Sequence, residues 1–428
     1  MSNIYNRVAF HTLGCKVNFS ETATISRDFI NAGFDVVGFD NDADIYVLNT
    51  CTVTNNADRK ARKYIRQINN KYDNPIVVLI GCYAQLKPDE TLKIPGVDLV
   101  VGINQKYELP KIINEYINSN IISYKGSNIN NFNLSYSINE RTRAYLKIQD
   151  GCSYNCSYCT IPLARGYSRS GEIDEIIRAC EQISDMGIKE IVISGINVGD
   201  YKTKNKETLI DLIKLLDNIE QVKRYRISSI EPNLLSLDII NFISESEKFM
   251  PHFHIPLQSG SDVILKKMKR KYDLEDYKNL ISTIHKIIPN SSIGADVMVG
   301  FPGETNTLFL DSFNFINKLE LSYLHVFPYS ERDNTLAKEE KNQVPYKERA
   351  SRSRILQNLS FQMKETFYNK NDNSVSNVLI DSFDGNFYYG YTDNYIRVRI
   401  PSNKNLKNSM IRTVISDYDE GFMFGRNL

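Results

Sequence analysis

Short apolar runs alternate with helical patterns in two long series, and this alternation constrains the fold more than any other feature. The first series spans residues 1–117, with strand candidates at VAFHTLG, DVVGF, ADIYVLNT and PIVVLIG. The helical patterns between them include SETATISRDFINAG and NNADRKARKYIRQINNK. Strand–helix alternation of this kind is typical of a parallel α/β sheet. We therefore expect an N-terminal parallel α/β domain.

A second α/β series begins at RTRAYLKIQDGC and extends over residues 138–366. Its strand candidates include EIVISG, YRISSIE, HFHIPLQ, GADVMVG and SYLHVFPYS. About six such βα units suit a complete or partial barrel. The Asn- and Ser-rich piece that precedes it, within residues 118–137, is predicted to be a linker.

The last segment, residues 367–428, changes character. Its strand candidates, VSNVLIDSF, NFYYGYT, NYIRVRIP and RTVISDY, are separated by Gly, Asn and Asp residues. This pattern predicts a small all-β barrel. The predicted class is thus α/β, with a parallel domain, a central partial βα barrel and a C-terminal β-barrel.

Composition narrows the classes of protein to which the chain can belong. Among 428 residues, 52 basic side chains face 51 acidic ones, so nucleic-acid contacts would need local patches. No run approaches ~20 consecutive apolar residues, and the N-terminus lacks the pattern of a signal peptide. Seven cysteines in such a chain favour a reducing, cytoplasmic compartment over a disulfide framework.

The sharpest local motif is the C-x3-C-x2-C loop formed by Cys152, Cys156 and Cys159. Three thiolates at this spacing can hold three irons of a cubane cluster, because a short loop can wrap one face of it. Zinc normally takes four protein ligands, and no fourth Cys or His lies within a few residues. A zinc site or a chance grouping of cysteines is the alternative.

Three further cysteines, Cys15, Cys51 and Cys82, each follow a strand candidate. The carboxyl ends of parallel strands share one edge of a sheet, so these thiols could converge there. Without further information, a shared metal site and three unrelated thiols are equally good interpretations. Cys180 lies in the amphipathic run IDEIIRACEQISDMG and is predicted to be a buried helical thiol.

Together these motifs resemble the radical S-adenosylmethionine (SAM) superfamily and, within it, the methylthiotransferase family. The segments that carry the resemblance follow in order: TLGCKVN (12–18), NTCTVTNNADRKAR (49–62), GCYAQ (81–85), QDGCSYNCSYCTIPLARG (149–166), RISSIEP (226–232), HIPLQSGSDVILKKMKRKY (254–272) and GADVMVGFPGET (294–305). The resemblance implies an enzyme that uses two 4Fe-4S clusters and SAM to modify adenosine 37 of tRNA or a ribosomal protein. It implies that Cys152, Cys156 and Cys159 hold the cluster that cleaves SAM. It also implies that Cys15, Cys51 and Cys82 hold the second cluster, and that residues 367–428 form a TRAM module that contacts the substrate.

TLGCKVN, NTCTVTN and SSIEP are most similar to the branch that acts on N6-threonylcarbamoyladenosine, so its 2-methylthio derivative is the expected product. N6-isopentenyladenosine tRNA or a ribosomal protein is the alternative substrate. A non-catalytic iron–sulfur protein that binds RNA or transfers electrons is the alternative of another class. It would leave unexplained why both clusters have three cysteine ligands. Asn334 stands where the family usually has Gly, and Asn tolerates the left-handed backbone that such a turn requires.

Polar groups at strand ends face the mouth of a βα barrel, so several could contact SAM. These candidates for SAM binding are Gly195, Ser229, Glu231, Gln258 and Asp296. His252 and His254 flank Phe253, and we expect one of the two to face inward as a hydrogen-bonded core residue. No catalytic residue is predicted beyond the cluster ligands.

Two basic runs lie next to the motifs of the expected active site. The first contributes Arg59, Lys60, Arg62, Lys63 and Arg66, and the second is KKMKRKY at 266–272. A charge run is usually a solvated helix face, but this position favours phosphate contacts with an anticodon stem-loop. The expected partners are tRNA and a reductant that supplies electrons. We expect neither a membrane nor an obligate protein partner.

Overall fold

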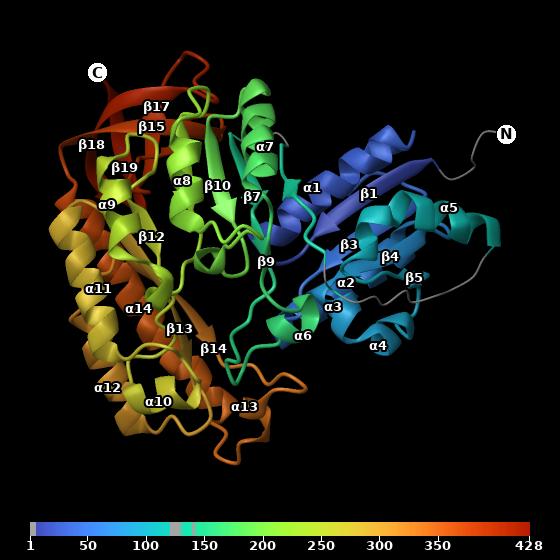
Figure 1. Ribbon diagram of the computed structural model, residues 1–428, viewed down its shortest axis with the longest axis horizontal. Helices are drawn as coiled ribbons and strands as arrows, with labels where there is room; N and C mark the ends of the chain where they lie inside the picture. Colours follow the sequence, from blue (N-terminus) through green and yellow to red (C-terminus); the bar gives the residue numbers. More distant parts are fainter. Residues whose placement is uncertain (1–5, 120–128, 130, 139–141) are drawn as a thin grey trace.

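A computed structural model gives the fold of the protein, and the structure is described for residues 6–119, 129, 131–138 and 142–428. Residues 120–128 and 130 of the predicted linker, like residues 1–5 and 139–141, lie outside the described residues. Figure 1 shows an N-terminal sheet beside a larger central α/β unit, with the C-terminal strands at one end of that unit. The predicted three-part α/β class is confirmed.

The N-terminal part is one parallel sheet with strand order β2-β1-β3-β4-β5. Its strands are β1 (Arg7–Thr12), β2 (Asp35–Val37), β3 (Ile45–Thr50), β4 (Ile76–Gly81) and β5 (Leu99–Val100). Its helices are α1 (Lys16–Asn31), α2 (Asn55–Lys71), α3 (Cys82–Leu86), α4 (Pro88–Leu92), η1 (Gln105–Glu108) and α5 (Leu109–Ser119). The central strands β3 and β4 are buried along their whole length, because helices cover both faces of the sheet.

The central part is an open, curved sheet of six parallel strands. Hydrogen bonds order them as β7-β10-β11 and β12-β13-β14, and bridges such as Ser229 to His254 join β11 to β12. These strands are β7 (Arg143–Lys147), β10 (Glu190–Ser194), β11 (Arg224–Ile227), β12 (His252–His254), β13 (Ser292–Val299) and β14 (Tyr323–Pro328). The short strand β6 (Ser135–Tyr136) runs antiparallel to β7, and β8 (Gln149–Asp150) pairs with β9 (Arg169–Ser170).

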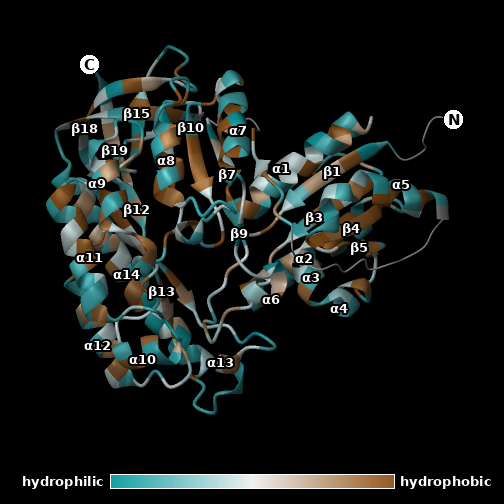
Figure 2. Cartoon of the chain, viewed as in Figure 1, coloured by the Kyte–Doolittle hydropathy of each residue, from teal (hydrophilic) through white to brown (hydrophobic). Residues whose placement is uncertain are grey.

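Helices cover the outer face of this sheet. The helices that pack on it are α7 (Ile173–Asp185), α8 (Leu209–Asp217), α9 (Leu237–Glu245), α10 (Asp262–Lys267), α11 (Leu274–Ile287), α12 (Asn306–Asn317) and α14 (Tyr346–Lys370). The other helices of the central part are α6 (Ile161–Arg165), η2 (Val198–Asp200), η3 (Pro232–Leu234) and α13 (Leu336–Glu339). Apolar residues at every second strand position, such as Ile293, Ala295 and Val297, pack beneath the helices on the outer face. Figure 2 shows the matching two-sided colouring of the helices. Cys180 lies in this core on α7, as predicted.

The C-terminal part is a closed barrel with strand order β15-β16-β17-β19-β18. Its strands are β15 (Ser374–Phe383), β16 (Phe387–Tyr391), β17 (Arg397–Pro401), β18 (Met410–Asp419) and β19 (Phe422–Asn427). The first four match the predicted strands, whereas β19 was not predicted. This last strand closes the barrel, because it pairs with both β17 and β18.

The N-terminal sheet is fastened to the central part at three places. Helix α1 packs against β6 and β7, and α3 packs against α6. Arg332, in the loop after β14, donates to Asn55 Oδ1 at 2.6 Å and pairs with Asp58 at 2.8 Å. The same loop contains Asn334, whose φ of 61° confirms the predicted left-handed turn.

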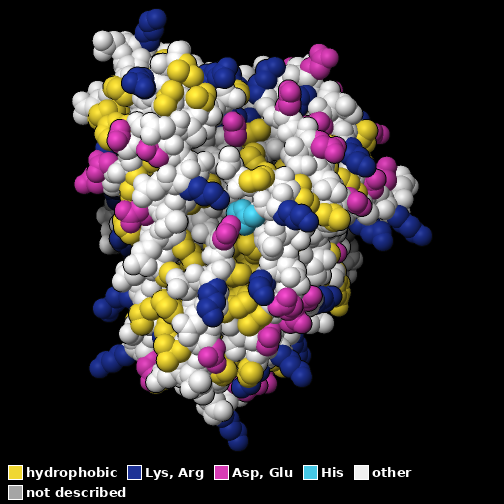
Figure 3. All heavy atoms as spheres, turned by 90° about the vertical axis from the view of Figure 1, so that its left-hand side faces the viewer, with side chains coloured by type: hydrophobic (Ala, Val, Ile, Leu, Met, Phe, Trp, Pro, Cys, Tyr) yellow, Lys and Arg dark blue, Asp and Glu magenta, His cyan; other side chains and the backbone are white. Residues whose placement is uncertain are grey.

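The surface carries both charges intermingled, in keeping with the nearly neutral composition. On the face drawn in Figure 3, Lys and Arg side chains alternate with Asp and Glu rather than gathering in one field. Among the helices that the structure describes, none has the length and apolarity that a membrane crossing requires.

Candidate functional site

Cys15, Cys51 and Cys82 lie at the same edge of the N-terminal sheet. Cys51 and Cys82 directly follow β3 and β4, and Cys15 follows the short loop after β1. In a sheet of order 2-1-3-4-5, ligands bind at the carboxyl ends of the strands near the switch point between β1 and β3. The structure therefore brings the three thiols together, as the strand-end pattern predicted.

Two glycines make this convergence of thiols sterically feasible. A Cβ on Gly14, whose φ is 110°, would lie 2.7 Å from the Cβ of Cys51. A Cβ on Gly81, whose φ is 93°, would lie 2.4 Å from the carbonyl oxygen of Thr50. Each glycine directly precedes a cysteine, so a side chain there would push that cysteine out of place.

These three thiols share an electrostatic environment. Cys15 is exposed, whereas Cys51 and Cys82 are buried. Burial raises the pKa of Cys51 to about 12, and the nearby sulfurs of Cys82 and Cys15 add to the shift. Burial also raises the pKa of Cys82, which the Arg165 guanidinium beside it partly offsets. A positively charged metal centre would supply the charge that these buried sulfurs need as thiolates.

Cys152, Cys156 and Cys159 lie in the loop between β8 and α6, at the carboxyl end of the central sheet. Cys152 Sγ accepts a hydrogen bond from the Tyr154 backbone N–H at 3.4 Å. Cys156 Sγ accepts one from Arg270 Nη1 at 3.3 Å. Burial raises the pKa of all three thiols, that of Cys159 to about 12. Hydrogen bonds to sulfur are one of the means by which proteins tune iron–sulfur clusters.

The donor sets fit clusters better than single metal ions. A tetrahedral zinc ion holds sulfur ligands at about 2.3 Å, which keeps them close to one another. Among the described residues, neither cysteine triad has all its ligand atoms within 4.8 Å of one another. A cubane distributes its cysteine ligands over several irons and tolerates wider spacing.

Four of the five predicted SAM-binding residues lie at the carboxyl ends of strands, on the side of the cysteine loop. Glu231 follows β11, pairs with Arg270 and lies within electrostatic range of Cys152 and Cys156. Arg270 is thus buried against the cysteine loop, so the prediction that its basic run, 266–272, contacts phosphates is wrong at this residue.

The other three members of this group have tightly constrained backbones. A Cβ on Gly195, after β10, would lie 2.9 Å from Gln149 Oε1, so a side chain there would displace Gln149. Ser229 forms a bridge with His254, and Gln258 forms one with Val297 at a φ of 67°. A left-handed non-glycine residue such as Gln258 is uncommon and often marks a functional site.

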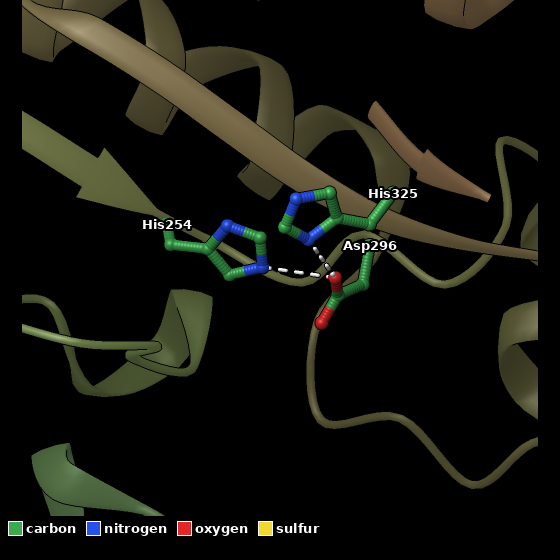
Figure 4. A group of neighbouring side chains, drawn as sticks. All are labelled: His254, Asp296 and His325. Carbon is green, nitrogen blue, oxygen red and sulfur yellow. Dashed lines mark hydrogen bonds and ion pairs between the residues drawn. The ribbon is translucent and has the colours of Figure 1, made fainter. Parts of the chain in front are cut away.

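Asp296, the fifth candidate, lies in the middle of β13 and contacts two histidines (Figure 4). Its Oδ1 is 2.9 Å from His254 Nε2 and 3.4 Å from His325 Nδ1. Burial opposes the charge of Asp296, but the two imidazoles hold its pKa well below the usual value. The structure thus places Asp296 in a polar cluster inside the sheet, with Glu231 in electrostatic range.

His252 and His254 both face the inner side of the sheet, whereas only one of them was expected to face inward. Residues two apart on a strand share a face, and Phe253 between them packs into the outer core. His252 Nε2 lies 2.9 Å from the Tyr323 hydroxyl. Both histidines are buried and hydrogen-bonded, as expected.

A buried network of ion pairs connects the two cysteine-bearing parts. Glu21 on α1 pairs with Arg165 at 3.0 Å, with Lys147 at 3.1 Å and with Lys106 at 2.6 Å. Arg165 also pairs with Asp150 at 2.8 Å. Burial alone would raise the pKa of Glu21, but Arg165, Lys106 and Lys147 together hold it well below its usual value. This network was not predicted, because its members are far apart in sequence and are individually unremarkable there.

The first basic run forms the outer face of α2. Arg59, Lys60, Lys63 and Arg66 are exposed, whereas Arg62 is tied to Glu90 and to the Tyr83 hydroxyl. The exposed members lie on the side of the helix opposite the buried residues Ala61, Ile65 and Ile68. Phosphate contact stays a prediction for the four exposed residues. Arg62 already pairs with Glu90 and is therefore less available to a phosphate.

Two family models match the chain. The first, described as uncharacterized protein family UPF0004, matches residues 7–102, and the second, the radical SAM superfamily, matches residues 146–316. The chain is 39% identical, over 97% of its length and 95% of the relative's, to a threonylcarbamoyladenosine tRNA methylthiotransferase, MtaB, of Bacillus subtilis. It is 38% identical to the protein of the same name from Aquifex aeolicus, over 87% of this chain and 92% of that one.

A relative named for another substrate is more distant. It is the tRNA-2-methylthio-N(6)-dimethylallyladenosine synthase of Endomicrobium trichonymphae, 30% identical over 97% of this chain and 98% of that one. Among solved structures, the radical SAM methyltransferase TsrM of Kitasatospora setae superposes with a TM-score of 0.56. It is 13% identical, over 78% of this chain and 77% of that chain. At this identity the likeness concerns the fold alone.

Proposed function

The chain belongs to the radical SAM tRNA methylthiotransferase family, and from this premise we propose that it acts on N6-threonylcarbamoyladenosine at position 37 of tRNA. The product would be the 2-methylthio derivative of that nucleoside. The observation that carries the choice of substrate is the identity of 39% and 38% to relatives named for threonylcarbamoyladenosine, against 30% to one named for dimethylallyladenosine. A tRNA substrate is in keeping with the cytoplasmic location expected from the sequence.

Membership of the family implies a 4Fe-4S cluster and SAM, and we propose Cys152, Cys156 and Cys159 as the ligands of that cluster. When bound, the cluster supplies the electron that cleaves SAM, and the resulting radical can abstract hydrogen from an unactivated carbon such as C2 of adenine. Arg270 would fix the loop by donating to Cys156 Sγ and pairing with Glu231. Glu231 would accept a hydrogen bond from the ammonium or ribose of SAM. Gly195, which has no side chain, would let the protein backbone approach the amino-acid end of SAM.

We further propose that Cys15, Cys51 and Cys82 hold a second 4Fe-4S cluster that carries the transferable sulfur. Their convergence at one edge of the sheet supports this role. The exposure of Cys15 gives a substrate access to the site from outside. A reductant would deliver the electrons, and the C-terminal barrel would contact the RNA in the manner of a TRAM module.

Nucleoside mass spectrometry of tRNA from cells with and without the gene tests the proposed substrate. We expect the 2-methylthio form of N6-threonylcarbamoyladenosine to disappear and the unthiolated nucleoside to accumulate. Complementation with the wild-type gene is the control. Loss of a 2-methylthio-isopentenyl nucleoside instead, or an unchanged profile, would contradict the proposal.

The exposed basic face of α2 leads to a prediction about salt dependence. Arg59, Lys63 and Arg66 are spaced to share one face of the helix, where they could contact phosphates. Replacing all three with Ala should reduce the slope of log affinity against log salt by about 0.7–0.9 for each lost contact. The measurement is stem-loop binding by fluorescence anisotropy over a range of salt concentrations.

A matched control removes the same charge elsewhere. Arg178 and Lys214 are exposed on α7 and α8, and Lys318 is exposed directly after α12; all three helices are outer helices of the central part. The variant with Ala at all three positions should keep the wild-type slope of log affinity against log salt. Equal slopes for the two triple variants would exclude α2 from the RNA-binding surface.

A further inference from the structure

The inner face of the central sheet is polar, although the interior of a βα barrel is normally filled with branched apolar side chains. Alternate residues of each strand point inward, opposite to the apolar residues that pack under the outer helices. The inward residues include Glu190 on β10, Arg226 on β11, His252 and His254 on β12, Asp296 on β13 and His325 on β14. This pattern marks the interior as a binding site for a polar group.

The C-terminal barrel closes the amino-terminal end of this interior. Arg226 donates to the carbonyl oxygens of Asp393 at 2.9 Å and Thr392 at 2.8 Å, and Arg224 pairs with Asp393 at 2.5 Å. These contacts hold the turn between β16 and β17, which carries Tyr395. The Tyr395 ring stacks on His252 with centroids 4.2 Å apart.

Tyr395 has an unusual backbone and an unusual electrostatic environment. Its φ is 70°, a left-handed conformation that is a genuine outlier for a bulky residue. Burial alone would raise its pKa, but Arg143, Lys16 and Arg226 more than offset that effect and lower it. Three cations therefore lie within electrostatic range of Tyr395 at this end of the interior.

The unpaired member of this positive set is Lys16, the first residue of α1 and the neighbour of Cys15. Arg143 and Arg226 both pair with Glu190, at 3.7 and 3.1 Å. Lys16 lies within electrostatic range of these two arginines and of Asp296. In the part of the chain that the structure describes, no group pairs with Lys16 within 4.0 Å, and none accepts a hydrogen bond from it. Arg143 also pairs with Asp381 at 3.7 Å. Among the described residues of this set, Lys16 is therefore the cation without a paired carboxylate.

The surroundings of Lys16 are also open to a ligand. Lys16 and Cys15 are exposed, and the side chain of His325 is 55% exposed although it points to the inner face. Asp296 fixes His254 and His325 through the same carboxylate oxygen, as Figure 4 shows. A planar polar group that enters past Cys15 would therefore meet an oriented imidazole and a free ammonium.

We propose that Lys16, with His325 beside it, binds the carboxylate of the threonylcarbamoyl group while the adenine lies between the two cysteine triads. This inference rests on the proposed function, because the carboxylate is what distinguishes N6-threonylcarbamoyladenosine from the apolar isopentenyl alternative. Lys16 would form a charge-assisted hydrogen bond with the carboxylate. Tyr395 and its stacked partner His252 would form the floor beneath the substituent. The C-terminal barrel would thereby take part in substrate selection as well as in RNA contact.

The test compares two anticodon stem-loop RNAs that differ in one group. One carries N6-threonylcarbamoyladenosine at position 37, and in the other a carboxamide replaces the carboxylate. We expect the wild-type holoenzyme to prefer the carboxylate RNA by about tenfold or more in KM, since a hydrogen bond to a charged group is lost with the amide. Lys16→Met should abolish the preference, Lys16→Arg should retain part of it, and His325→Ala should reduce it.

Lys347→Met is the matched control. Lys347 is exposed on α14, and its replacement removes the same charge as Lys16→Met. It should keep the full preference. The iron content of each variant is measured, so that a cluster lost through the neighbour Cys15 is not mistaken for lost recognition. Unchanged preference in both Lys16→Met and His325→Ala would overturn the inference, as would equal use of the two RNAs by the wild type. If the wild type modified only an isopentenyladenosine stem-loop, the proposed function itself would fall, and this inference with it.

Discussion

Replacing Cys152, Cys156 and Cys159 with Ala should reduce cleavage of SAM to 5′-deoxyadenosine to background. The same variant should lose about half of its iron, from about eight to about four atoms per chain, if each triad holds a 4Fe-4S cluster. The physical reason is that only a thiolate-ligated iron with an open position can bind SAM and pass it an electron. Iron analysis and chromatography of nucleosides after anaerobic reconstitution provide both measurements.

The other triad should give a different result. Replacing Cys15, Cys51 and Cys82 with Ala should also leave about four irons, but SAM cleavage should persist while no methylthio product forms. This difference separates the two roles, since the two variants contain the same amount of iron. If both variants lost SAM cleavage completely, the assignment of separate roles would be wrong.

Cys180 offers a matched control for both triads. It is a buried thiol in the core of the central part, on α7 and outside both triads. Cys180→Ala should keep all iron and all activity, with a stability cost of about 1 kcal/mol for the small cavity. An iron loss in this variant would show that thiol removal disturbs the clusters indirectly.

Much of this architecture could be predicted from local sequence patterns. Strand candidates followed by cysteines placed Cys15, Cys51 and Cys82 at one sheet edge, because parallel strands must end on the same side. The spacing of the second triad is itself local, so it needs no tertiary information. The strand β19 escaped prediction because GFMFGRN is short and rich in glycine, and it becomes a strand by pairing with β17 and β18.

The residues that line the interior of the central sheet were harder to predict, because they come from all three parts of the chain. In the sequence, nothing distinguishes Lys16 from other helix residues or Tyr395 from other turn residues. Asp296 is a predicted SAM contact because it was expected at a strand end, whereas it lies in the middle of β13 and contacts His254 and His325. A signal was present in the alternation of Arg224 with Arg226 and of His252 with His254, since polar residues at period two indicate a polar inner face.

The second large effect concerns Glu21, whose replacement by Gln should destabilise the protein by about 3–5 kcal/mol. Glu21 is fully buried between Lys106, Lys147 and Arg165, and it comes from a different part of the chain than the last two. The amide keeps the size of the side chain but leaves buried cations without their shared counter-charge. We expect the thermal unfolding midpoint to fall by several degrees under anaerobic conditions. Glu175→Gln, an exposed acid on α7, is the control and should leave the midpoint unchanged.

A second substitution tests whether charge imbalance is the cause. Burial lowers the pKa of Lys106 to about 8 despite Glu21 beside it. The positive charge of Lys106 therefore depends strongly on the carboxylate of Glu21. Lys106→Met in the Glu21→Gln background removes the cation that has lost its partner, and the midpoint should recover most of the loss. Arg165 would then still be held by Asp150 at 2.8 Å. Failure of the double variant to recover would mean that the geometry of the carboxylate, rather than its charge, holds the N-terminal sheet to the central part. In that case Arg165 would lose its bidentate partner in both variants, and they would unfold at the same temperature.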